Sequence, residues 1–179
     1  MASSTGGSGN VAGGTAGSGA VAPPLLPPAA PLGVATGSCT NPASAIELAA
    51  AQAATSLLPA LAGTKAMAGA KAIGAPIAAQ FQQGQCLEVT VNMTPGKCYS
   101  VVAGGLPTVQ NLDLSLVAAA ILPGLPQVVA ASDSSVGPTS VLGETPNCFK
   151  WALPMAGTMK LIVSVSAGQG LAAAQVFEK

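Results

Sequence analysis

The C-terminal part of the chain alternates between apolar and polar side chains. Leu87, Val89, Val91 and Met93 alternate with polar residues, and residues 158–166 repeat the pattern. Because successive side chains of a strand point to opposite faces, this period of two predicts strands with one buried face. Glycine and proline pairs interrupt the alternation at short intervals, as turns between antiparallel strands do. Eight or nine strands are predicted, at about residues 77–82, 86–93, 97–103, 111–118, 127–132, 139–142, 147–152, 158–166 and 171–177.

A helical period precedes the strands. Between residues 46 and 57 apolar side chains recur every three or four positions, which predicts a helix with one packed face. Asn41 can cap its first turn, Pro42 suits its first position, and Pro59 is expected to end it. A second, weaker helix is predicted over residues 60–73, with a partly ordered linker as the alternative. We therefore expect one or two helices to pack on the strands.

The N-terminal region has the composition of a spacer. Residues 2–20 are almost entirely Gly, Ser, Thr and Ala, which bury too little apolar surface to order a chain. Five prolines within residues 22–32 favour a stiff polyproline II segment. A tether is therefore predicted for residues 1–38, a helical segment for 39–75, and a mainly β, antiparallel sandwich for 76–179. Two other interpretations of the N-terminal region stay open, filler without a role and a proline-rich ligand for an aromatic groove.

Charged residues are scarce, at 7% of 179 residues, and the chain has neither histidine nor arginine. An average soluble domain carries about 25% charged residues. The six lysines are scattered, whereas nucleic acid binding requires clustered cations that displace counterions from phosphates. No run of about 20 apolar residues lacks a glycine or proline. We therefore expect neither a nucleic acid partner nor a membrane-spanning helix.

The residue types that carry most enzyme chemistry are also missing. Without histidine, a serine nucleophile would need a lysine base, and the chain contains no Ser-x-x-Lys motif. The six carboxylates show no spacing typical of an acid-base pair, so we expect no enzymatic activity and no cofactor. Asp113 and Asp133 are weak candidates for a calcium site, because hard cations bind carboxylate oxygens. Acids that simply face the solvent are the alternative interpretation.

The strongest structural signal in the sequence is its four cysteines, Cys39, Cys86, Cys98 and Cys148. An even set with no Cys-x-x-Cys pair and no histidine is typical of two disulfides rather than a zinc site, and free buried thiols are the other alternative. Cys98 and Cys148 lie in predicted strands and Cys39 precedes the first predicted helix, so we favour the pairs Cys98–Cys148 and Cys39–Cys86. Sequence alone leaves all three connectivities open. Each favoured loop closes about 50 residues, which stabilises the fold by about 4 kcal/mol if chain entropy dominates.

Disulfides imply an oxidising compartment of the extracellular type. The chain opens Met-Ala-Ser-Ser-Thr-Gly-Gly, without the basic and apolar regions of a secretory signal. We therefore expect that Met1 stands in place of a removed export signal, such as that of a lipoprotein.

Several short motifs beyond residue 84 resemble a known family. They are Pro95-Gly96, Lys97-Cys98-Tyr99-Ser100-Val101, Asn111-Leu112-Asp113-Leu114-Ser115-Leu116, Val129-Ala130-Ala131-Ser132-Asp133-Ser134 and Leu153-Pro154-Met155-Ala156-Gly157-Thr158-Met159-Lys160-Leu161. With these motifs, residues 84–177 resemble the bacterial pre-peptidase C-terminal domain. The resemblance implies a jelly-roll-like β-sandwich and a non-catalytic role beside secreted enzymes, in secretion, surface attachment or substrate contact. Cys86, Cys98 and Cys148 lie outside the usual pattern of that family.

Two further runs, Lys97-Cys98-Tyr99 and Cys148-Phe149-Lys150-Trp151, resemble uncharacterised secreted or lipid-anchored bacterial proteins. These observations predict a non-enzymatic, exported bacterial module that acts in surface attachment, binding or structure, outside the cell or at its surface. The expected partners are other proteins, copies of the chain itself or the cell envelope. The alternative is a self-assembling subunit of an extracellular filament or layer, because surfaces with few charges are easily desolvated and a net charge of zero removes repulsion.

Overall fold

The computed structural model of the chain describes residues 38–118 and 128–179. In these residues ten strands and two short helices follow one another. Their order is β1 (Ser44–Ala45), α1 (Gln52–Thr55), α2 (Leu58–Lys65), β2 (Lys71–Phe81), β3 (Cys86–Met93), β4 (Cys98–Gly105), β5 (Val109–Ala118), β6 (Val128–Ser132), β7 (Thr139–Leu142), β8 (Phe149–Lys150), β9 (Gly157–Gly168) and β10 (Gly170–Glu178).

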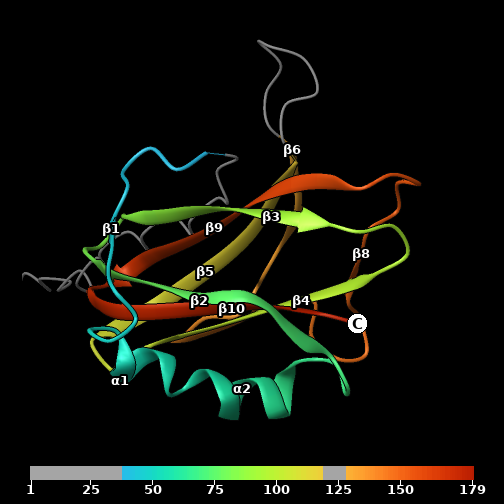
Figure 1. The fold of residues 1–179 in the computed structure, drawn as a ribbon. Coiled ribbons are helices and arrows are strands. Elements are labelled where there is room, and N and C mark those ends of the chain that lie inside the picture. Colours follow the sequence, from blue (N-terminus) through green and yellow to red (C-terminus); the bar gives the residue numbers. More distant parts are fainter. Residues whose placement is uncertain (1–37, 119–127) are drawn as a thin grey trace, which may run out of the picture. The chain divides into compact units, whose positions relative to one another are not determined.

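The strands form two antiparallel sheets that stack face to face (Figure 1). The six-stranded sheet has the order β1-β2-β10-β4-β7, and β8 pairs with β4 beside this path. The four-stranded sheet has the order β3-β9-β5-β6. Helices α1 and α2 lie against the six-stranded sheet, on its face away from the four-stranded sheet. The predicted antiparallel β-sandwich is thus confirmed.

Apolar side chains from both sheets fill the space between them. On β5, Leu112, Leu114 and Leu116 are at most 1% exposed and belong to the main core. Tyr99 of β4 is also buried, and its hydroxyl bonds to the Thr94 N–H at 2.6 Å and to a Glu178 carboxylate oxygen at 3.0 Å. Each fully buried leucine contributes about 1.5–3 kcal/mol to folding. The apolar positions of the alternating pattern are therefore the inward face of the strands.

The predicted helix start at Asn41 and Pro42 is wrong. Pro42 forms an isolated parallel bridge with Cys86, and the backbone N–H of Ala43 donates to the Cys86 carbonyl at 2.7 Å. The two residues of β1 then pair with β2, and α1 is the only helix before residue 58 in the described residues. Neighbouring strands supply the backbone hydrogen bonds that a helix would have made internally. Tertiary contacts therefore override the local capping signal.

Pro59 begins a helix instead of ending one, which corrects a second expectation. It occupies the first turn of α2, where its missing N–H leaves no hydrogen bond unmade. The helix ends at Lys65 and β2 begins at Lys71, so only the first part of the helix predicted over 60–73 is formed. Residues 39–75 are therefore partly helical and partly strand.

The other strands lie close to their expected positions. β3 and β7 have the predicted bounds, β2 begins at Lys71 instead of residue 77, and β8 keeps only two residues of the predicted 147–152. Residues 1–37, which hold nearly all of the predicted tether, and residue 127 lie outside the described residues. Neither helix in the part that the structure describes is long and apolar enough to cross a bilayer.

Candidate functional site

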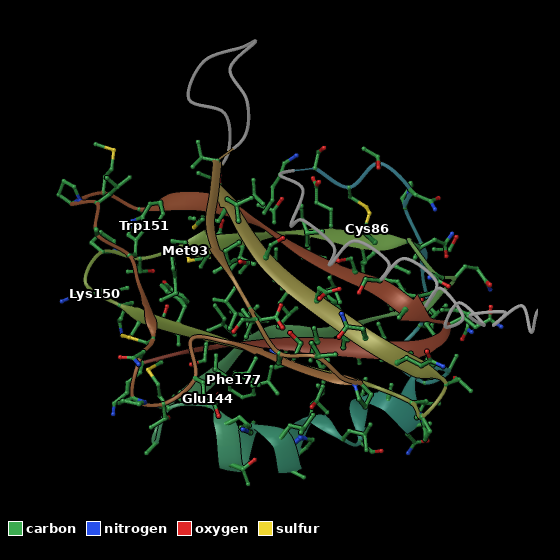
Figure 2. The ribbon with its side chains drawn as sticks, turned by 180° about the vertical axis from the view of Figure 1, so that it is seen from behind. Cys86, Met93, Glu144, Lys150, Trp151 and Phe177 are labelled. Carbon is green, nitrogen blue, oxygen red and sulfur yellow. A yellow bond between two sulfur atoms is a disulfide. The ribbon has the colours of Figure 1, made fainter. Side chains whose placement is uncertain are left out.

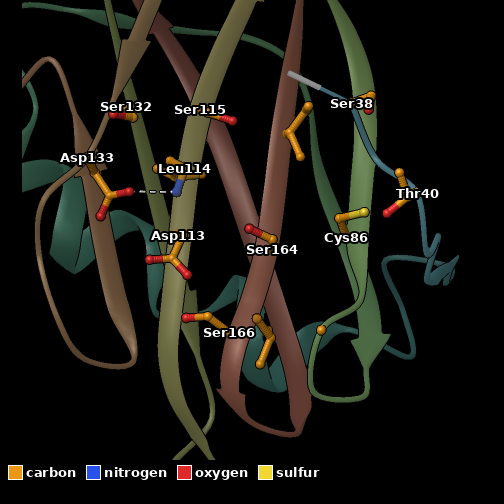
Figure 3. A pocket seen from close by; sticks show the side chains of 13 residues that line it. Ser38, Thr40, Cys86, Asp113, Leu114, Ser115, Ser132, Asp133, Ser164 and Ser166 are labelled. Carbon is orange, nitrogen blue, oxygen red and sulfur yellow. Dashed lines mark hydrogen bonds between the residues drawn. The ribbon is translucent and has the colours of Figure 1, made fainter. Parts of the chain in front are cut away.

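A pocket of about 190 Å³, here called the polar pocket, lies on the outer face of the four-stranded sheet (Figure 3). Strands β5 and β9 form its floor. Ser38 and Thr40 contribute to one wall, and the end of β6 contributes to the other. Most of its polar side chains carry hydroxyl or carboxylate groups and come from neighbouring strands or, for Asp133, from the residue that follows β6, namely Asp113, Ser115, Ser132, Asp133, Ser164 and Ser166.

Strand alternation and register bring these side chains together. The leucines of β5 point inward, so Asp113 and Ser115 between them point outward. Asp113 lies opposite Ser164 of β9, and Ser115 lies opposite Ser132 of β6. Directly opposed residues of an antiparallel pair place their side chains on the same face. The floor is therefore a set of short polar side chains that leaves open space above the sheet.

Asp133 is held in place at the edge of the polar pocket. Its Oδ1 accepts a hydrogen bond from the Leu114 backbone N–H at 2.7 Å, drawn in Figure 3, and its own N–H donates to the Leu114 carbonyl at 3.0 Å. The Ser135 hydroxyl donates to Oδ2 at 2.7 Å. These bonds extend the pairing of β6 with β5 beyond the end of β6. They also fix the direction in which the carboxylate points.

Asn111 orients the carboxylate of Asp113. Its Nδ2 donates to Asp113 Oδ1 at 3.0 Å and to Ser166 Oγ at 2.7 Å, and its Oδ1 accepts from the Gly137 N–H at 2.9 Å. Because both ends of the amide are engaged, Asn111 cannot rotate without breaking a hydrogen bond. Asp113 is thereby positioned by a fixed neighbour.

The two carboxylates give the polar pocket an uncompensated negative charge. Burial raises the pKa of the Asp113 carboxyl above its ordinary value, hydrogen bonds from Ser166 and Asn111 lower it, and the negative charge of Asp133 adds to the rise. Among the described residues that line the pocket there is no lysine. A neutral or positively charged ligand is therefore favoured over an anion.

Ser115 of β5 points its hydroxyl into the polar pocket, where water or a ligand can reach it. It is only 6% exposed, yet its hydroxyl has no hydrogen-bond partner among residues 38–118 and 128–179. Figure 3 shows its oxygen directed into the space beside β9. Ser132 and Ser164 also lack a hydroxyl partner in these ranges. Because these hydroxyls have no protein partner, they are available to water or to a bound molecule.

Asp113 and Asp133, the two calcium candidates, line the same pocket. The described ranges contain no group of three or more His, Cys, Asp or Glu side chains that could hold a metal ion. Calcium takes about six to eight oxygen ligands. The calcium site therefore stays a prediction.

Sequence reasoning did not single out the serines of the polar pocket. The usable signal was their position, because Ser115 and Ser164 alternate with apolar residues that belong to the core. Serine is also common on solvated sheet faces, so that signal does not distinguish a binding site from an ordinary surface.

Two disulfides lie near opposite ends of the strands, as the positions of Cys86 and Lys150 show (Figure 2). Cys39 pairs with Cys86 and Cys98 pairs with Cys148, with Cα–Cα distances of 5.7 Å and 5.5 Å. This is the pairing favoured from the sequence. Because Cys86 itself lines the polar pocket, the first bond secures the wall that contains Ser38 and Thr40.

A second pocket of about 430 Å³ lies between β2 and β3. Its walls combine apolar residues, with Ile73 and Ile77 on one side and Val89 and Val91 on the other, with polar residues at the end of β3 and beyond it. Glu178 is the only titratable side chain among its described lining residues. Because two carboxylates converge with several serine hydroxyls in the polar pocket, against the single carboxylate here, the polar pocket is the better candidate for a functional site.

Comparison of the chain with known protein families, curated proteins and solved structures finds no significant match.

Proposed function

We propose that the chain is a non-enzymatic, exported β-sandwich module that acts by binding or attachment at a cell surface. The observation that carries the proposal is the pair of disulfides, one of which joins Cys39 to the start of β3 while the other joins the start of β4 to Cys148, just before β8. Disulfides persist in oxidising compartments and are rare where thiols are kept reduced. The resemblance to the bacterial pre-peptidase C-terminal domain fits a non-catalytic role and stays a prediction.

The position of Cys39 supports attachment through the N-terminal region. This residue follows the predicted tether directly and is bonded to Cys86, the first residue of β3. Strand β3 in turn pairs with β9 from Cys86 to Met93. A pull on the N-terminal side of Cys39 therefore passes into the four-stranded sheet and bypasses β1, α1, α2 and β2. Such a connection suits a module carried on a spacer.

The chemistry of the polar pocket supports binding rather than catalysis. Its described titratable groups are two carboxylates, both held by hydrogen bonds, and its serines have no lysine or histidine beside them to act as a base. Such an arrangement can accept hydrogen bonds and attract positive charge. It offers no activated nucleophile.

Thiol trapping in native cells tests the proposal of export. Protein taken from its source cells is denatured with a maleimide reagent present, and its mass is compared with that of a reduced control. We expect no added maleimide before reduction and four after it, together with protease access to the chain on intact cells. Reactive thiols in a protease-protected, intracellular chain would contradict the proposal.

A second function, self-assembly into a filament or layer, is favoured by strand β6. This strand is an edge of the four-stranded sheet in the described residues, and its sequence Val-Val-Ala-Ala-Ser carries no charge or proline. Edge strands are usually guarded by such residues, and Val128 is 63% exposed. Another copy could therefore add a strand at this edge.

Light scattering and electron microscopy test assembly. Val128→Lys should abolish any large species formed by the wild-type chain, because a charge at the edge opposes strand addition. Val136→Lys is the matched control, since Val136 is 78% exposed and lies outside the strands. Wild-type protein that stays monomeric at high concentration would exclude this second function.

A further inference from the structure

We propose that the polar pocket binds a small polyhydroxylated ligand, a neutral or amino sugar. The inference rests on the proposed binding role and names its ligand class. It starts from the side chains on the outer face of β5, β6 and β9, which offer hydroxyl and carboxylate oxygens within one cavity.

The hydrogen-bonding groups of the polar pocket match those of a sugar. A serine hydroxyl can both donate and accept a hydrogen bond, and a carboxylate accepts at two oxygens. Sugar hydroxyls likewise donate and accept, and two neighbouring hydroxyls can bond to the two oxygens of one carboxylate. Ser115 and Ser164 beside Asp113 thus present both kinds of partner on one surface.

Ser115 adds a second observation, because this residue is more than nine-tenths buried and directs its hydroxyl into the polar pocket without a partner among the described residues. Ser115 is 6% exposed, lines the polar pocket and has no partner among the described residues. A bound hydroxyl group would exchange a hydrogen bond with Ser115 in place of water.

The negative charge of the polar pocket determines which sugars it should favour. Asp113 and Asp133 face the pocket together, while Lys65 and Lys97 pair with carboxylates elsewhere, at 2.7 Å from Glu144 and 3.5 Å from Glu178. Negative charge without a nearby cation repels uronic acids and attracts an ammonium group. An amino sugar should therefore bind more tightly than its neutral counterpart, and a sugar carboxylate should bind least.

Size and composition limit the ligand and its affinity. A volume of about 190 Å³ suits a single sugar ring and is below the range of about 300–1,000 Å³ found for drug-sized ligands. Aromatic side chains are absent from the described lining of the polar pocket, so ring stacking does not contribute. We therefore expect recognition by hydrogen bonds and charge, with a Kd on the order of 1 mM.

Three sugars of one ring type test the proposal: glucosamine, methyl glucoside and glucuronate. Amide NMR spectra of the full chain are recorded during titration with each of them. We expect glucosamine to bind at least about threefold more tightly than methyl glucoside, and glucuronate to bind least. The shifted resonances should include those of residues 113–115 and 164–166.

Matched variants locate the site. Asp113→Asn should weaken glucosamine binding about tenfold and methyl glucoside binding less, because a charged hydrogen bond is replaced by a neutral one. Ser115→Ala should weaken both sugars about threefold. Ser134→Ala, an exposed serine outside the polar pocket, is the control and should change neither Kd. Ser115→Ala and the sugar series remain informative if Asp113→Asn fails to fold.

Several results would overturn the proposal. One is an unchanged spectrum with all three sugars far above the expected Kd, and another is a set of shifts confined to residues outside the polar pocket. A third is calcium chloride binding that Asp113→Asn abolishes while the sugars have no effect, which would identify a cation site instead. None of these results bears on thiol oxidation in native cells, so the proposed export can stand when the sugar proposal fails.

Discussion

At the scale of single residues, two buried serines are expected to affect the stability of the fold in opposite directions. Ser140 of β7 is fully buried opposite Ala103, a member of the main core, and its Oγ has no hydrogen-bond partner among the described residues. Ser100 of β4 is also fully buried, but its hydroxyl donates to the Gly143 carbonyl at 2.6 Å. The Ser140 hydroxyl is therefore expected to destabilise the fold, whereas the Ser100 hydroxyl stabilises it through its hydrogen bond to the Gly143 carbonyl.

Alanine substitutions separate the two serines. Ser140→Ala should leave the free energy of unfolding unchanged or raise it by up to about 1 kcal/mol, because an unpaired buried hydroxyl is removed. Ser100→Ala should lower it by about 1–2 kcal/mol, because the Gly143 carbonyl loses its partner. Urea unfolding measures both. Equal destabilisation by the two variants would contradict this assignment.

Protonation of Asp113 is coupled to folding. Burial raises its pKa in the folded chain above that in the unfolded chain, so the folded state holds the proton more tightly. The stability contribution of this group is therefore lost as pH rises from about 4, the ordinary aspartate pKa, through the raised value. Asp113→Asn should remove this part of the pH dependence, measured as the urea midpoint across that range.

Glu47→Gln is the control for this prediction, because it neutralises an exposed carboxylate outside the polar pocket. It should keep the wild-type pH dependence. An Asp113→Asn variant whose stability falls as steeply as that of the wild type would show that another group is responsible.

At the scale of elements, two adjacent glycines of β4 set how closely its neighbours approach. A Cβ on Gly104 would lie 2.9 Å from Leu61 Cδ1 of α2, whereas a Cβ on Gly105 would lie 2.7 Å from Val109 Cβ. The terminal methyl of Leu61 can move aside. Val109 cannot move aside in the same way, because it is 1% exposed and branched at Cβ. The absence of a side chain at Gly104 thus lets α2 pack closely on β4, and its absence at Gly105 lets the start of β5 do the same.

The two glycines predict unequal costs of substitution. Gly105→Ala should lower the free energy of unfolding by about 2–3 kcal/mol, because the backbone must shift to avoid Val109. Gly104→Ala should lower it by about 1 kcal/mol or less, because a rotation of Leu61 relieves the contact. Thermal and urea unfolding of both variants give the comparison. A larger loss in Gly104→Ala would show that α2 is the more rigid neighbour.

Prediction of elements from the sequence succeeded where the period of two and turn residues coincide, as in β3 and β7. It failed at β1, because Ser44 and Ala45 become a strand only by pairing with Gln80 and Ala79, far along the chain. The helical pattern there is short, and backbone pairing with the edge of β2 replaces it. Pro59 was misjudged because proline favours the first turn of a helix as well as the end of one.

At the scale of the whole molecule, the two disulfides close loops of nearly equal length, with sequence separations of 47 and 50. Each double cysteine-to-serine variant should therefore lose about 4 kcal/mol of stability by chain entropy. Removing Cys39–Cys86 should also weaken glucosamine binding, because this bond holds one wall of the polar pocket. Removing Cys98–Cys148 should not, since neither residue lines that pocket.

Urea unfolding and calorimetric titration of the two double variants check this prediction. Equal loss of sugar affinity in both would show a general loosening of the sandwich and no special role for the bond beside the pocket. A stability loss far below the expected value in either variant would show that the unfolded chain is already restricted there.

The amino-acid sequence by itself determined the β class, most strand positions and the preference for two disulfides, because alternation, turn residues and cysteine count are local or compositional properties. Only the tertiary structure decided which side chains form the polar pocket. Leu114 and Asp133 are 19 residues apart, and Asn111 and Ser166 are 55 apart, yet each pair is joined by a hydrogen bond. Their meeting depends on the register of β6, β5 and β9, and a slip of one residue would turn a strand's polar side chains to the opposite face. No local pattern encodes that register.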